Sequence, residues 1–140
     1  MAPFRFVSLY TDGGARGNPG PAAIGVVVCG EADDVLEEHK EHIGDATNNE
    51  AEYRALIKGL DLAAAHTRKE VRCVMDSELV VRHLMGEYRV KSQRMKQLFG
   101  QVKDKQRMFE KVRYRHRPCR TGRLRRADEL VNEALDEAGF

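Results

Sequence analysis

The order of strand-like and helix-like segments is the feature that most constrains how this chain folds. Three segments with the alternation and composition of β-strands come first, at residues 4–11, 22–29 and 35–43. Strand-like segments at 71–75 and 112–116 then alternate with helical patterns at 47–65, 79–84, 92–108 and 127–138. This order predicts an α/β domain in which the first three strands form an antiparallel meander and helices cover the faces of a mixed sheet.

The size and composition of the chain are those of a globular protein. Its 140 residues suit one domain, and 41% hydrophobic with 33% charged residues argues against disorder and excludes collagen-like sequences. No apolar run approaches the ~20 residues that cross a bilayer, and the first residues lack the features of a signal peptide. We therefore expect a cytoplasmic protein without a membrane partner, and because nothing in the sequence requires a dimer, we expect a monomer.

Charge is distributed very unevenly along the chain. Residues 91–126 contain fourteen Lys and Arg but only Asp104 and Glu110, whereas the net charge of the whole chain is +2. A local excess of positive charge favours a polyanionic partner, because contacts with phosphates release condensed counterions. The alternative is that these residues form a solvated helix face.

Four acidic residues stand at positions where a fold of this type would place functional groups. Asp12 follows the first predicted strand and Asp76 follows the fourth, and the ends of strands are favoured functional positions in open sheets. Glu52 lies in the first turns of the long helix, and Asp128 opens the last helix. Each residue taken alone is more readily explained as a helix cap or a surface charge.

Together, the four carboxylates fit a site for divalent cations. Mg²⁺ takes oxygen ligands, usually from a few carboxylates, and two such ions ~3.5 to 4 Å apart can activate water and stabilise the leaving oxygen in phosphodiester hydrolysis. Without a cation, two carboxylates ~4 Å apart would repel by about 4 kcal/mol at an effective dielectric constant of ~20. The sequence alone does not show that the four residues meet.

Four motifs carry a resemblance to a known family. Residues 11–21 read Thr-Asp-Gly-Gly-Ala-Arg-Gly-Asn-Pro-Gly-Pro, and residues 47–52 read Thr-Asn-Asn-Glu-Ala-Glu. Asp-Ser follows at 76–77, and Arg-Ala-Asp-Glu-Leu at 126–130. In this order, and over nearly the whole chain, the motifs resemble those of ribonuclease HI (type 1 ribonuclease H).

The resemblance implies a single ribonuclease H domain over residues 1–140. Its ribonuclease H-like fold would have a five-stranded mixed sheet, with three antiparallel strands and then two parallel ones, flanked by helices. The implied activity is endonucleolytic hydrolysis of the RNA strand of RNA/DNA hybrids by a two-metal-ion mechanism. Two Mg²⁺ or Mn²⁺ ions would be held by a catalytic set of carboxylates, with Asp12 bridging the ions: Asp12, Glu52, Asp76 and Asp128.

The same resemblance places four residues against the hybrid, namely Gly13, Asn18, Asn48 and Asn49. Glycine permits a close approach of the backbone, and amide side chains can bond to 2′-hydroxyls and base edges in a shallow minor groove. Helix capping is the alternative role for Asn48 and Asn49, and one of them can do both.

Three departures from the family pattern affect the prediction. Many members have a histidine in the loop before the last acidic residue, but residues 117–125 contain none, so Arg120 is the candidate replacement because arginine can pair with phosphate. Glu78 replaces a glutamine that often follows the Asp-Ser pair, and a carboxylate there would repel phosphate unless it faces solvent. Residues 85–91 resemble the compact branch that lacks the basic protrusion, and the helix within 91–111 can supply that charge instead.

Two further functions stay open at this point. Glu78 and the missing histidine motivate a module that binds hybrids or double-stranded RNA and turns over weakly or not at all. Weak cleavage of duplex RNA is the other. The presence of all four carboxylates favours the nuclease.

Overall fold

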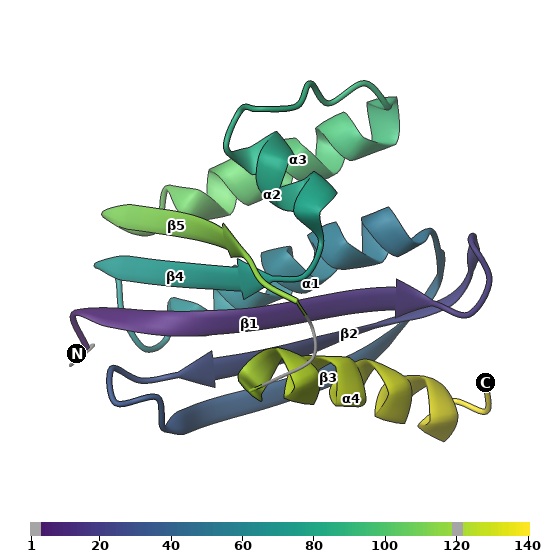
Figure 1. Cartoon of the computed structure of the whole chain (residues 1–140), viewed down its shortest axis with the longest axis horizontal. Helices are drawn as coiled ribbons and strands as arrows, with labels where there is room; N and C mark the ends of the chain where they lie inside the picture. Colours follow the sequence, from purple (N-terminus) through teal and green to yellow (C-terminus); the bar gives the residue numbers. More distant parts are fainter. Residues whose placement is uncertain (1–3, 119–121) are drawn as a thin grey trace.

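The computed structural model describes residues 4–118 and 122–140, which fold into a five-stranded sheet flanked by helices (Figure 1). The elements in chain order are β1 (Phe6–Ala15), β2 (Gly20–Cys29), β3 (Val35–Ala46), α1 (Asn48–Ala63), β4 (Glu70–Met75), α2 (Glu78–Leu84), α3 (Gln93–Gln106), β5 (Lys111–His116) and α4 (Gly122–Glu137). Within the sheet the order is β3-β2-β1-β4-β5, with β1, β2 and β3 antiparallel and β1, β4 and β5 parallel. The predicted mixed sheet is therefore confirmed.

Helices cover the two faces of the sheet unequally. The main core lies between the sheet and α1, α2 and α3, and it contains Leu9, Leu56, Leu60, Val71 and Leu98. On the other face, α4 packs across β2, β1 and β3 (Figure 1). None of the helices in the described part of the chain is long and apolar enough to cross a membrane.

The long helix α1 begins where the sequence predicts it. The Thr47 hydroxyl accepts a hydrogen bond from the Glu50 backbone N–H, and the Glu50 carboxylate accepts one from the Thr47 backbone N–H. This reciprocal pair satisfies two N–H groups that an α-helix leaves without internal partners. The cap is thus Thr47, and Asn48 is the first helical residue.

Strand β1 is longer than predicted, and this changes the setting of Asp12. The first strand was predicted to end at residue 11, before the glycines that follow Asp12, but β1 continues to Ala15 and pairs with β2 as far as Ala15↔Ala22. Asp12 therefore lies within the strand, not after it. The prediction failed because glycine was interpreted as a turn signal, whereas pairing with β2 keeps the backbone extended there.

Helix α4 also begins earlier than predicted, at Gly122 instead of residue 127. Leu124 is buried and extends the apolar stripe of Leu130 and Val131 by more than one turn towards the amino terminus. Asp128 consequently lies in the second turn of α4 and does not open the helix.

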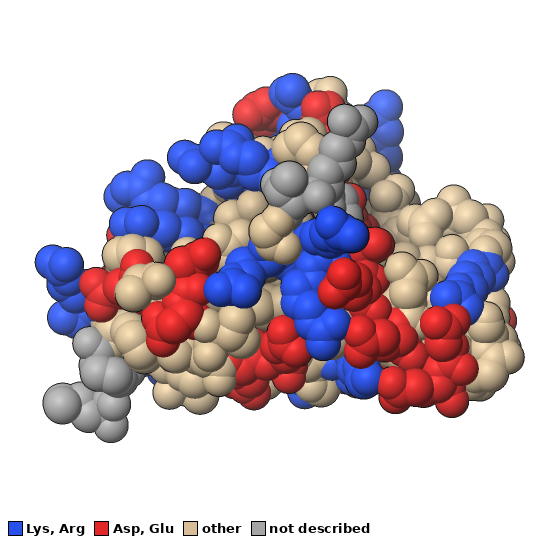
Figure 2. All heavy atoms as spheres, turned by 60° about the horizontal axis from the view of Figure 1, so that its bottom comes forward, with Lys and Arg blue, Asp and Glu red and all other residues tan. Residues whose placement is uncertain are grey.

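Much of the basic segment is neutralised by acidic residues from other parts of the chain. Arg126 of α4 forms ion pairs with Glu38 of β3 at 3.0 Å and with Glu133 at 2.7 Å, and Lys105 of α3 pairs with Asp61 of α1 at 2.8 Å. Figure 2 shows the basic and acidic side chains interleaved over the face that carries α4 and β3. On this face the basic residues are solvated, and they also connect secondary-structure elements through ion pairs.

Candidate active site

The parallel pairing of β1 and β4 places Asp12 beside Asp76. The register aligns Tyr10 with Val74, so that Asp12 and Asp76 are the next positions on the same side of each strand. Asp76 follows the last residue of β4, and Ser77 then caps α2 by accepting a hydrogen bond from the Val80 backbone N–H at 3.3 Å. The two carboxylates therefore lie where parallel pairing ends.

Glu52 reaches the same point from α1. Its Oε1 accepts a hydrogen bond from the Gly13 backbone N–H at 2.7 Å. A Cβ atom on residue 13 would lie 2.2 Å from the carbonyl carbon and oxygen of Ala51, so only glycine permits α1 to approach β1 this closely. The close approach that Gly13 allows in the structure is thus to α1, and it is what brings Glu52 to Asp12.

The three carboxylates form a compact group, which we call the site triad (Asp12, Glu52 and Asp76), and Asp76 is its half-buried member. One carboxylate oxygen from each lies within 4.8 Å of the others. Asp12 is only 7% exposed and Glu52 9%, so neither charge is well solvated. Among the described residues, no Lys or Arg forms an ion pair with the site triad.

Burial and mutual repulsion raise the pKa values of two of these carboxyl groups. For Asp12 the largest cause is burial, followed by the charges of Glu52 and Asp76 and by its contact with Asp128. For Glu52 burial again comes first and the charge of Asp76 second, while the hydrogen bond from Gly13 acts in the opposite direction. A group of this kind holds protons at neutral pH or binds a cation.

Asp128, on α4, lies beside the site triad. All four carboxylates line one open hollow of about 320 Å³, together with Gly13, Asn48 and Asn49. Asp128 contacts Asp12, but it is not among the three residues whose ligand atoms converge within 4.8 Å. The predicted four-carboxylate set is thus brought to one place, with three members in the closest group.

Asn48 and Asn49 line the hollow, and hydrogen bonds of Asn48 connect α1 to β1 and to the hairpin loop. The Oδ1 atom of Asn48 accepts a hydrogen bond from the Ala15 backbone N–H at 2.8 Å. Asn18 is not part of the lining of the hollow, and its Oδ1 accepts from the Asn48 backbone N–H at 3.0 Å. In both side chains the oxygen is engaged with the backbone, so the Nδ2 amino group is the donor that can face a ligand.

Two residues of the hollow were not singled out from the sequence. Asn132 stands one turn after Asp128, and its Nδ2 donates to the Asp128 carbonyl oxygen at 3.2 Å. Arg16 pairs with Asp136 at 2.8 Å and with the Phe140 carbonyl oxygen, so that it ties the end of β1 to α4. The spacing of Asn132 from Asp128 is a signal that the sequence contained, whereas the role of Arg16 depends on tertiary structure.

The departures from the family pattern have different outcomes. Arg120 lies outside the described residues. Glu78 begins α2 with its side chain 51% exposed and 3.7 Å from the Arg82 guanidinium, so it is solvated and partly neutralised. His116 is the exposed last residue of β5, as expected for a residue that ends the strand.

The donors of the site fit a hard divalent cation. The site triad offers three carboxylate oxygens at close range, and carboxylate oxygen is the ligand type that Mg²⁺ and Mn²⁺ prefer. A bound cation would also offset the repulsion that raises the pKa values of Asp12 and Glu52.

Comparisons with known proteins agree with this arrangement. A profile of the reverse transcriptase-like family matches residues 10–134. A bifunctional protein of Mycobacterium tuberculosis is 43% identical over 133 residues, which cover 94% of this chain and 36% of that protein. Ribonuclease HI of Halobacterium salinarum is 38% identical over 132 residues, which cover 94% of this chain and 65% of that enzyme. The chain thus spans about a third of the first relative and just under two thirds of the second.

A solved structure extends the similarity to three dimensions. LC11-RNase H1, whose structure was solved in complex with an RNA/DNA hybrid, superposes with a TM-score of 0.87 at 43% sequence identity. The superposition covers 94% of this chain and 98% of that one. At this coverage the similarity includes the elements that carry the four carboxylates.

Proposed function

This chain belongs to the ribonuclease HI family, within the reverse transcriptase-like proteins, and on that premise we propose that it hydrolyses the RNA strand of RNA/DNA hybrids. The observation that carries the proposal is the site triad: three carboxylates that converge within 4.8 Å, with no ion pair to Lys or Arg among the described residues. Such a group is costly unless a cation joins it.

The cofactor that fits these donors is Mg²⁺ or Mn²⁺, with two ions per site. Asp12, Glu52 and Asp76, together with Asp128, would hold the ions, and bound ions would supply an activated water and stabilise the leaving oxygen. Asp12 is the residue best placed to serve both ions, because Glu52, Asp76 and Asp128 all lie against it.

Residues in and beside the hollow position the substrate in this proposal. The Nδ2 groups of Asn18, Asn48 and Asn49 would donate to the 2′-hydroxyls and base edges that distinguish RNA from DNA. Gly13 would admit the hybrid backbone and also orients Glu52 through its N–H group. Arg120 is kept as the candidate for the missing loop histidine.

We also propose that residues 1–140 act as one ribonuclease H domain, as a monomer in the cytoplasm. The alternative of a binding module rested on Glu78 and on the missing loop histidine. Glu78 no longer supports it, because its side chain is exposed and paired with Arg82. Turnover is therefore favoured over binding alone, and cleavage of duplex RNA is a question for the assay below.

The experiment supplies labelled RNA/DNA hybrid, duplex RNA and duplex DNA in equal amounts, each with Mg²⁺, Mn²⁺ or EDTA. We expect cutting of the RNA strand of the hybrid in either metal and none in EDTA. Binding of the hybrid without cutting in both metals would support the binding module instead. Cutting in EDTA would contradict the role given to the carboxylates.

A further inference from the structure

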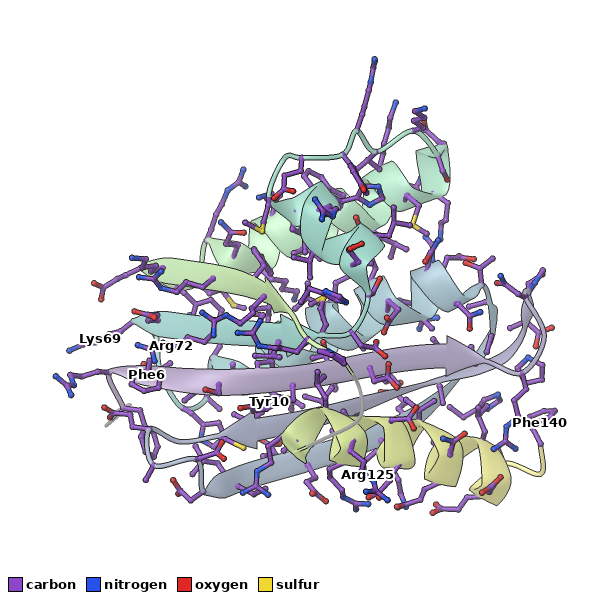
Figure 3. The ribbon with its side chains drawn as sticks, viewed as in Figure 1. Phe6, Tyr10, Lys69, Arg72, Arg125 and Phe140 are labelled. Atoms are coloured by element: carbon purple, nitrogen blue, oxygen red, sulfur yellow. The ribbon has the colours of Figure 1, made fainter. Side chains whose placement is uncertain are left out.

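One part of the sheet has no helix over it. On the face that carries α4, this helix covers β2, β1 and β3, while β4, β5 and the first half of β1 stay uncovered by the described elements (Figures 1 and 3). We call this surface the open face, and it is defined by Phe6, Tyr10, Arg72, Val74, Arg113 and Arg115. In Figure 3 the labelled residues Phe6, Tyr10 and Arg72 lie on it, away from the core.

The strand registers arrange these side chains in rows. Tyr10 aligns with Val74 and Val74 with Arg115, while in the preceding row Ser8 aligns with Arg72 and Arg72 with Arg113. Successive rows are two residues apart along each strand, or about 6.6 Å. The opposite side of β5 packs into the core through Val112 and Tyr114.

The open face has an excess of positive charge. Glu70 is the acidic residue of β4 and β5, and it accepts from Arg72 at 2.7 Å and from Arg113 at 3.2 Å. One carboxylate thus serves two guanidinium groups, and Lys111 and Arg115 on the same side of β5 add two further charges. The side chains of Arg72 and Arg113 are about half exposed, at 48% and 57%.

Flat π-surfaces are interleaved with this charge. The Arg72 guanidinium lies over the Phe6 ring at 3.6 Å from its centroid, so that the two groups form a stack. Tyr10, half-buried against α4, closes one side of a shallow hollow of about 440 Å³ that Arg72, Val74, Arg113 and Arg115 also line. Unpaired bases stack on aromatic rings and on guanidinium planes, while their phosphates pair with arginines.

The open face lies next to the candidate active site along β1 and β4. Tyr10 and Asp12 lie on the same side of β1, and Val74 and Asp76 are the corresponding positions of β4. The row after Tyr10 and Val74 is therefore the carboxylate pair itself. A strand that leaves the carboxylates towards the amino ends of β1 and β4 passes Pro118 and Leu124, which line a hollow with Tyr10 and Val74, and then meets the arginines and Phe6.

We propose that the open face binds single-stranded nucleic acid that continues from a hybrid held at the carboxylates. The inference rests on the proposed function of that site and adds a substrate class to it: hybrids with an unpaired RNA or DNA tail. A duplex offers phosphates but keeps its bases stacked on one another, so it would not use the aromatic and guanidinium surfaces.

The test measures binding in EDTA, where the RNA is not cut. A labelled blunt hybrid is compared by fluorescence anisotropy with the same hybrid carrying an eight-nucleotide tail, in separate RNA-tail and DNA-tail series on each end. We expect at least one tailed hybrid to bind about tenfold more tightly than the blunt one, as stacking of a single base can provide. The series that shows the gain identifies the kind of tail and its polarity.

The variant for this test is Arg113→Ser with Arg115→Ser, both exposed on the edge strand β5. It should lose most of the gain from the tail and leave binding and cleavage of the blunt hybrid unchanged. The slope of log K against log salt should fall by about 1.4 for the tailed hybrid, because two phosphate contacts are lost. Lys96→Ser with Arg107→Ser is the matched control, since it removes the same charge from exposed positions of α3 on the other face.

Equal affinity of the wild type for blunt and tailed hybrids would overturn the proposal, and this comparison needs no variant. An equal loss of the gain in the α3 control would also overturn it, because the effect would then be one of total charge. Thermal unfolding checks that both variants are folded. Failure of the proposed function would appear separately, as uncut hybrid in Mg²⁺ and Mn²⁺.

Discussion

Two groups of carboxylates in this molecule face opposite electrostatic surroundings. In the site triad, Asp12 and Glu52 are buried and their pKa values are raised. Between β3 and α4, by contrast, Glu38 and Glu133 accept hydrogen bonds from Arg126. There the pKa of Glu133 is lowered, first by Arg126 and then by a hydrogen bond from Lys40.

This electrostatic difference distinguishes carboxylates that connect secondary-structure elements from carboxylates that are available to a ligand. In the second group Glu38 and Glu133 form ion pairs with Arg126, and Glu133 also pairs with Lys40. These ion pairs connect α4 to the edge strand β3. In the site triad no Lys or Arg among the described residues forms such an ion pair. The missing positive charge must come from outside the polypeptide, and this asymmetry can be tested by making equivalent changes in both groups.

The largest expected effect is on catalysis. Asp12→Asn should lower the rate of hybrid cleavage by about 1,000-fold or more, since a metal site contributes several kcal/mol of transition-state stabilisation. Glu133→Gln removes the same charge from the other group and should leave the rate unchanged. Both are measured as single-turnover cleavage in Mg²⁺, and retained activity in Asp12→Asn would contradict the metal assignment.

The next effect is on thermal stability in the presence of metal. At 100 times the dissociation constant, Mg²⁺ or Mn²⁺ should stabilise the wild type by about 2.7 kcal/mol. The melting temperature should then rise by several degrees, and Asp12→Asn should lose most of this rise while Glu133→Gln retains it. A melting curve of the wild type that is indifferent to both ions would exclude a clustered cation site.

A smaller effect is expected from pH in EDTA. Folding raises the pKa of Asp12, so the folded state binds its proton more tightly than the unfolded state does. The resulting contribution to the free energy of unfolding is fully present below the ordinary pKa of 3.8 and is lost as pH rises through the raised pKa. Between about pH 5 and about pH 9 the wild type should therefore lose stability relative to Asp12→Asn. Melting temperatures that run parallel across this range would show that folding does not raise the pKa of Asp12.

The smallest effect is on the stability of the β3–α4 contact. Glu133→Gln should lower the melting temperature by less than about 2 °C, because exposed ion pairs contribute little. The difference should shrink in ~1 M salt, which screens the pairs with Arg126 and Lys40. A larger loss that salt does not change would mean that packing, not charge, holds α4 to β3.

The sequence predicted the order of elements because hydrophobic alternation and periodicity are local signals. Where it failed, a distant partner decided the local structure. The backbone at Gly13 and Gly14 stays in β1 because β2 pairs with it, and Gly13 is required by the approach of Ala51 on α1. The β2 partners lie nine and eleven residues further along the chain and Ala51 lies 38 residues beyond Gly13, so the local pattern at the glycines did not show either contact.

The site shows the same division. The positions of the four carboxylates and the family motifs were enough to select Asp12, Glu52, Asp76 and Asp128 from the sequence. Their convergence depends instead on the register of β1 with β4 and on where α1 and α4 pack. The basic segment illustrates the converse. Its net charge suggested a polyanion, whereas Arg126 and Lys105 pair with glutamate and aspartate from other elements, which a count along the chain does not show.

The four carboxylates come from β1, α1, the end of β4 and α4, and this spread has a consequence for the order in which they are assembled during synthesis. A ribosome releases Asp12, Glu52 and Asp76 well before α4, so a nascent chain carries the triad while β2 is still uncovered and Asp128 is absent. Domains are completed as units during synthesis. The set of four carboxylates is therefore complete only once α4 has packed on the sheet.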